Sequence, residues 1–241
     1  MEFQDLSVCL ENDGILNVYK AVFNKKVKGE FVNKLISKTT AFVNFNCSGS
    51  FLKLDSPISR LVPYPRLHFV TPSYASTTIN NDPDPQIIVN MSNTLFHKDN
   101  NFVTCDYDRF MNHFGFCFVY RGIIQNSQEL IRNAFSFIKY KQKAEAGKEY
   151  YFVENNRPNI NSTNTAIDKS VFDAIGIKNY SGVYTFWNKI MENYEKSIEN
   201  TSEVKRFLDS GLEEGELKTC KESLQSIIED YKEFQTAVDD R

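Results

Sequence analysis

Familiar catalytic motifs are missing from this sequence of 241 residues. No GxxxxGK[ST], GxGxxG or GxSxG pattern occurs, so the sequence predicts neither a standard phosphate-binding loop nor a nucleophile elbow. Only 3 histidines are present, few for acid–base chemistry. No run of 18 apolar residues occurs, and Met1 to Ser7 is polar and acidic, so we expect neither a membrane span nor a secretory signal.

Cysteines number five, an odd count, and no CxxC pair occurs. This usage is typical of reduced thiols in a cytosolic protein rather than a disulfide framework. Cys105, His113 and Cys117, with His97 upstream, are the one constellation that suggests a metal. In a strand, the equal parity of His113 and Cys117 would put both on one face. The apolar run around them is more typical of a buried strand, and we expect no metal site.

Hydrophobic residues make up 41% of the sequence, and 20 Phe and 12 Tyr supply bulk for a core. Apolar periodicity predicts helices, and short alternating or continuous apolar runs predict strands. The predicted helices are 11–20, 30–46, 86–96 and 127–141, the predicted strands are 67–70, 114–121 and 150–153, and 72–85 reads as a polar loop. Strands that alternate with helices indicate an α/β fold with a mixed sheet. We expect His68 to have a structural, hydrogen-bonded role.

The last part of the sequence is different, because helices are predicted over 184–198, 202–210 and 213–238. From Glu195 to Arg241 there are 13 acidic and 7 basic residues, a net charge of −6, which leaves +3 for the first 194 residues. An acidic helical end on a mildly basic body argues against nucleic-acid binding, which needs a basic face. It suits a basic partner, although a solvated helix face explains the charge equally well.

Several motifs resemble segments of the tubulin family. Leu61–Phe69, LVPYPRLHF, closely resembles the segment that opens the tubulin intermediate domain. Val119–Gly122 is similar to the end of a central strand there, and Gly211–Leu217, GLEEGEL, to the entry of the last long helix. Its second glycine favours α-tubulin, and Met91–Phe96 fits a comparable α-tubulin pattern.

The resemblance implies the C-terminal half of an α-tubulin. Residues 1–59 would be the end of the nucleotide domain and the core helix. Residues 60–181 would form an intermediate domain with a mixed β-sheet flanked by helices, and residues 182–241 a C-terminal helical hairpin. The expected location is the cytoplasm and the cytoskeleton.

The resemblance also carries over single nucleotide-site residues. The family's two guanine-reading asparagines fall on Asn12 and Asn33, while the base-stacking tyrosine falls on Gly29. The glutamate that activates water falls on Ser56, which is no general base. GTP is therefore the cofactor that the family implies, yet we expect no GTP binding by this chain alone and assign no catalytic residue.

The sequence thus predicts a divergent α-tubulin-like protein without GTPase activity of its own. Its predicted partners are α/β-tubulin or a microtubule-associated protein, bound through Glu213, Glu214 and Glu216, with no nucleic acid and no membrane. One alternative is the C-terminal portion of a complete GTP-binding, GTP-hydrolysing tubulin. Another is a degenerate relic, in which Phe31, Leu35, Ile36, Phe42 and Val43 of the core helix would be partly bare and invite a partner or aggregation.

Overall fold

A computed structural model describes residues 7–23, 29–44, 61–62, 64–77, 86–105, 113–122, 129, 133, 144–154 and 172–239. The chain forms two units. The first comprises residues 1–104 and 113–180, and the second comprises residues 105–112 and 181–241.

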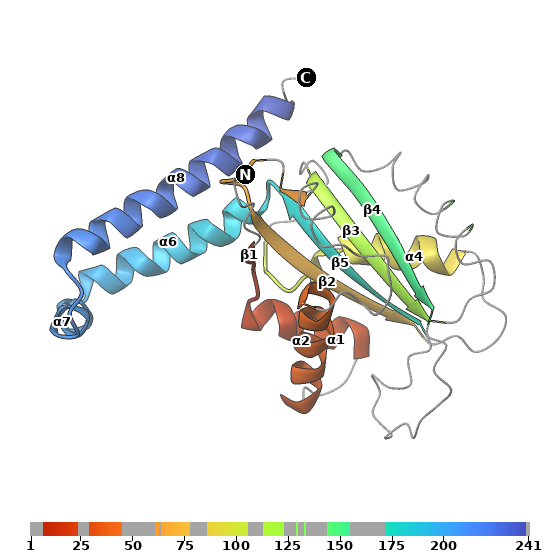
Figure 1. Ribbon diagram of the computed structural model, residues 1–241. Helices are drawn as coiled ribbons and strands as arrows, with labels where there is room; N and C mark the ends of the chain where they lie inside the picture. The colour runs from red at the N-terminus through yellow and green to blue at the C-terminus, as the bar shows by residue number, and fades with distance from the viewer. Residues whose placement is uncertain are drawn as a thin grey trace. The chain divides into compact units, whose positions relative to one another are not determined.

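The first unit is built on a five-stranded mixed sheet with the order β1-β2-β5-β3-β4 (Figure 1). The strands are β1 (Ser7–Val8), β2 (Phe69–Thr77), β3 (His113–Gly122), β4 (Ala144–Glu154) and β5 (Phe172–Tyr180). β1 runs parallel to β2 and β3 parallel to β4, while β5 is antiparallel to both β2 and β3. The predicted mixed sheet flanked by helices is confirmed.

Helices cover both faces of this sheet. Side chains alternate between the faces along each strand, so both faces carry apolar side chains that a helix can cover. Helix α4 (Gln86–Phe96) packs on one face, against Ala75, Phe118 and Ala174 among others. Helices α1 (Asn12–Phe23) and α2 (Gly29–Asn44) pack on the other face, around Tyr74 and Ile175. The relic alternative would leave the core helix partly bare, but Leu35 is fully buried and Ile36 packs against the same cluster. The side chains of Phe31, Phe42 and Val43 lie outside the described part.

β2 is longer than predicted, because it continues to Thr77 into the segment expected to be a polar loop. Its polar side chains are buried in the sheet, where Thr71 Oγ1 donates to the carbonyl of Lys178 and Ser73 Oγ to that of Gly176, both at 3.4 Å. A polar composition therefore does not exclude a central strand when neighbouring backbone groups satisfy it. Residues 78–85 lie outside the described part, as does most of the predicted 127–141 helix.

β3 contains a register irregularity between His113 and Gly115. His113 packs against Phe96 and Phe116, on the α4 face. Cys117 belongs to the cluster of Val119 and Ile177 on the opposite face. The prediction that His113 and Cys117 share a face is therefore wrong, since a bulge breaks the simple alternation. Within the described ranges, no three His, Cys, Asp or Glu side chains are grouped to hold a metal ion.

The second unit contains the predicted helical hairpin. Its helices are α6 (Val183–Glu199), α7 (Thr201–Asp209) and α8 (Glu214–Asp239). α6 and α8 lie side by side (Figure 1), joined by a 2.6 Å hydrogen bond from the Tyr194 hydroxyl to the carbonyl of Leu217. None of the helices in the described part combines the length and the apolar character needed to cross a bilayer.

Candidate functional site

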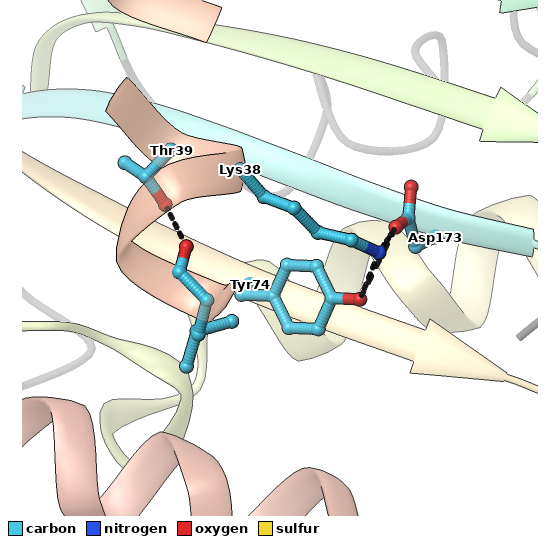
Figure 2. A network of polar contacts seen from close by, with 5 residues as sticks. Lys38, Thr39, Tyr74 and Asp173 are labelled. Atoms are coloured by element: carbon cyan, nitrogen blue, oxygen red, sulfur yellow. Dashed lines mark hydrogen bonds and ion pairs between the residues drawn. The ribbon is translucent and has the colours of Figure 1, made fainter. Parts of the chain in front are cut away.

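A network of polar side chains fixes α2 to the sheet (Figure 2). Lys38 Nζ lies 2.6 Å from Asp173 Oδ2 at the start of β5, and the Tyr74 hydroxyl of β2 donates to the same oxygen at 3.2 Å. The Lys38 side chain is 25% exposed and that of Asp173 only 8%. The ion pair therefore holds a largely buried carboxylate and connects α2 to the start of β5.

The two predicted guanine-reading residues both lie on exposed positions. Asn12 is the first residue of α1 and Asn33 lies in the first half of α2. The two helices contact each other, so both carboxamides belong to the same outer helical layer of the first unit. Gly29, the position of the expected stacking ring, begins α2, and Ser56 lies outside the described residues.

Glu11 positions the start of α1, a role that the sequence analysis missed. Its Oε2 accepts hydrogen bonds from both the backbone N–H (2.6 Å) and the hydroxyl of Thr104, and its own N–H donates to the carbonyl of Phe102 at 2.9 Å. Gly14 allows the helix to approach closely, since a Cβ there would lie 2.4 Å from the Phe102 carbonyl carbon. Asn12 is thereby held on a fixed helix end.

A second feature that the sequence analysis missed is the support of the LVPYPRLHF segment. The N–H of Leu67 donates to the carbonyl of Tyr64 at 2.9 Å, which closes a β-turn with Pro65 and Arg66 at its tip. Asn179 of β5 is fully buried, and its Nδ2 donates to the carbonyls of Leu61 (2.8 Å) and Leu67 (2.5 Å). One buried amide therefore holds both sides of this turn.

His68 completes the support of the turn. Its Nδ1 hydrogen-bonds the carbonyl of Pro65 at 2.6 Å. The structural role predicted for this histidine is confirmed, and the segment is anchored at three backbone carbonyls.

The predicted partner-binding glutamates lie where α8 begins. Glu216 Oε2 accepts a 2.9 Å hydrogen bond from the backbone N–H of Glu213, the reciprocal half of a capping box. Glu216 thus has a structural task in addition to its charge, while the side chain of Glu213 is exposed. Glu214 is the first residue of α8, and its side chain lies outside the described part.

Lysines of α8 interact with groups of their own unit. Lys221 forms a 2.8 Å ion pair with Glu195 of α6, and this hydrogen bond raises the pKa of Lys221. Lys218 lies 3.8 Å from Glu222, and Lys232 stands over the ring of Tyr184. Exposed acidic residues further along α8 include Glu229 and Glu233. The helix therefore keeps an acidic outer side.

Two other buried polar groups have structural explanations. The hydroxyl of Tyr120 hydrogen-bonds Ser92 Oγ at 2.6 Å, and burial raises the pKa of Tyr120. Lys178 donates to the carbonyl of Leu95 at 2.6 Å, in the last turn of α4, and to Asn101 Oδ1. Both groups tie α4 to the sheet.

Comparisons with known proteins agree with the family resemblance that the sequence motifs indicated. No protein-family model matches the chain. The tubulin alpha-6 chain of Naegleria pringsheimi is 24% identical over 250 residues, covering 97% of this chain and 53% of the relative. The tubulin alpha chain of Dictyostelium discoideum is 21% identical (99% and 54% covered), and the tubulin alpha-1 chain of Saccharomyces cerevisiae 23% (97% and 54%).

The resemblance to α-tubulins that the motifs indicated is confirmed, because it extends over nearly the whole chain. The chain spans about half the length of the curated relatives it matches. This share is consistent with the expected correspondence to the C-terminal half.

Proposed function

We propose that this chain, similar to α-tubulins along nearly its entire length, is a divergent α-tubulin-like cytoskeletal protein. It acts in the cytoplasm as a structural constituent of, or a binder to, tubulin or microtubule assemblies. The observation that carries the proposal is the alignment over 97% of the chain with α-tubulin relatives. The mixed sheet and the C-terminal helical hairpin agree with the architecture that the resemblance implies.

The proposed contact surface is the acidic outer side of α8 and the segment before it. Glu213, Glu229 and Glu233 are exposed there, while Lys218 and Lys221 interact with neighbouring carboxylates. A partner with a basic surface would meet an excess of negative charge, which favours encounter and fixes orientation. Tubulin or a microtubule-associated protein is the proposed partner.

We further propose that the chain hydrolyses no GTP on its own. The resemblance puts Ser56 where the family has its water-activating glutamate, and a serine hydroxyl is not basic enough to take that role. The sequence also has no glycine-rich phosphate loop.

Binding to purified α/β-tubulin tests the main proposal, with Glu213→Lys/Glu214→Lys as the central variant. Glu216 is kept because it caps α8 through the backbone N–H of residue 213, which this variant retains. We expect saturable binding by the natural chain, and at least about tenfold weaker binding by the variant, since each reversal replaces an attraction by a repulsion. The effect should shrink as salt is raised.

Two controls keep this experiment specific. Glu216→Gln removes one charge but keeps an amide oxygen that can accept the capping hydrogen bond. Glu192→Lys reverses an exposed charge on α6. Unchanged far-UV circular dichroism is expected for all variants. No binding by the natural chain would contradict the proposed function, and equal weakening by Glu192→Lys would contradict the assignment to the start of α8.

A second candidate function is GTP binding as part of a complete tubulin. The exposed carboxamides of Asn12 and Asn33 on two contacting helices favour it, since paired amides suit a guanine edge. Calorimetry with GTP tests whether these two asparagines form a guanine site within this chain. We expect no saturable binding at micromolar nucleotide, whereas binding that is lost in both Asn12→Ala and Asn33→Ala would favour the second candidate.

A further inference from the structure

We propose that Ser210 is a phosphorylation site for a serine kinase that selects acidic residues after the serine. In this reaction the Ser210 Oγ attacks the γ-phosphorus of ATP, so that the Oγ–P bond forms while the bond from the phosphorus to the leaving ADP breaks. The hydroxyl proton passes to the carboxylate base of the kinase. The inference goes beyond the proposed function and does not depend on tubulin as the partner.

Accessibility of the hydroxyl is the first observation. Ser210 lies in the short connection between α7 and α8, where Asp209, Ser210 and Gly211 are all exposed. A Cβ built on Gly211 would meet no atom within 4 Å, so the space beside the serine is open. Among the residues that the structure describes, Ser210 is the one exposed serine or threonine that lies outside helices and strands. A kinase can therefore reach this side chain from the solvent.

The local backbone is the second observation, because a kinase binds its substrate as an extended segment. Ser210 caps the end of α7, where its Oγ donates to the carbonyl of Arg206 at 2.7 Å. This hydrogen bond is exposed, so water replaces it when the segment opens. Helix ends with few buried contacts open locally far more easily than the core of a domain. The serine can therefore enter an active site without unfolding of the unit.

The charge pattern around the serine is the third observation. Asp209 comes directly before it and Glu213 comes three positions after it, and both side chains are exposed. Acidic residues on a substrate complement a basic substrate groove, and such charge patterns set the specificity of kinases. The next residue is a glycine rather than a proline, and Phe207 stands three positions before the serine, where kinases for basic motifs need an arginine. The pattern therefore favours a kinase with a basic groove.

Thr219 shows why the charge pattern alone is insufficient. It is exposed and has an acidic residue, Glu222, three positions later. However, Thr219 lies inside α8, and its Oγ1 donates to the carbonyl of Gly215 at 3.0 Å. A kinase could bind this segment in an extended form only after α8 had unwound. Ser210 combines the acidic pattern with a backbone that a kinase can reach.

Incubation of the full chain with Mg²⁺, ATP and a purified kinase that requires an acidic residue three positions after the serine tests this inference. We expect mass spectrometry to find one phosphoryl group per chain and peptide fragmentation to locate it on Ser210. Glu213→Gln should lower the initial rate at least about tenfold, because it removes one charged contact with the groove. Its backbone N–H, which Glu216 binds, is retained. The matched control Glu222→Gln, which neutralises another exposed glutamate, should leave the rate unchanged.

The location of the phosphate on the natural chain decides the outcome without any variant. A natural chain that stays unmodified, or that carries its phosphate on Thr219 or elsewhere but not on Ser210, would overturn the inference. An equal loss of rate in Glu213→Gln and Glu222→Gln would also overturn it, since the effect would then not belong to the position after the serine. Ser210→Ala should abolish the modification, and circular dichroism should show that its helices are intact. Tubulin binding enters none of these measurements, so a failure here leaves the proposed function standing.

Discussion

Removing the cation of Lys38 is the most direct test of how α2 is held on the sheet. In Lys38→Met, the apolar stem is preserved and the ammonium is lost, so Asp173 keeps only the 3.2 Å hydrogen bond from Tyr74 among the contacts of the network in Figure 2. Asp173 is then a largely buried carboxylate without its ion-pair partner, a situation that destabilises the folded state.

The expected magnitude follows from the exposure of the two side chains. Breaking a fully buried pair costs about 3–5 kcal/mol, whereas an exposed pair is worth at most about 1 kcal/mol. Asp173 is nearly buried and Lys38 is one-quarter exposed, so we expect a loss of about 2–3 kcal/mol in the free energy of unfolding for Lys38→Met. Asp173→Asn should lose less, because the amide is neutral and Lys38 can reach water.

Urea unfolding followed by far-UV circular dichroism measures these free energies. The double variant Lys38→Met/Asp173→Asn should be more stable than the sum of the two single losses predicts, since it leaves no unpaired buried charge. Fluorescence of Trp187, the only tryptophan, reports separately on the second unit. Strictly additive losses, or a Lys38→Met variant as stable as the natural chain, would refute the assignment of the ion pair.

Three further substitutions test other contacts. Asn179→Asp removes the amide that donates to the carbonyls of Leu61 and Leu67, so thermal unfolding should show a loss of about 2–5 kcal/mol; an unchanged midpoint would contradict the clamp. Gly14→Ala puts a Cβ 2.4 Å from a backbone atom of Phe102 and should lower the free energy of unfolding in urea by about 1–3 kcal/mol. No loss of stability would mean that the helix shifts freely and would contradict the close approach. Gly211→Ala forces a φ of +100° on an alanine and should cost about 1 kcal/mol, measured as ellipticity at 222 nm during heating; stabilisation instead would refute the left-handed cap.

Periodicity was sufficient to predict most helices. α1, α2, α4, α6, α7 and α8 all agree with predicted helices to within a few residues. An apolar stripe at helical spacing explains the agreement for the helices that pack on the core, whereas Phe207 of α7 is exposed. The structure shows how α7 ends: Gly211 adopts the left-handed conformation, and its N–H donates to the carbonyl of Leu208.

The interactions that determine the candidate surfaces were harder to predict from sequence. Asn179 binds carbonyls 112 and 118 positions away, and Lys38 pairs with a carboxylate 135 positions away. Partners so distant in sequence are brought together only by the strand order, which no local pattern encodes. Glu216 had a local signal, its spacing of three residues from Glu213, but glutamate is an unusual residue at the start of a capping box.

The order of the strands has a consequence for synthesis. β5 lies between β2 and β3, yet it is the last strand along the chain. About 95 residues separate the end of β2 from the start of β5, roughly 5 to 20 seconds of translation at ordinary ribosomal speed. During that interval the edges of β2 and β3 that later pair with β5 lack this strand. Unpaired strand edges can form hydrogen bonds with strands of other chains. Until Tyr180 has been synthesised, the edges of β2 and β3 that β5 covers have no neighbour from β5.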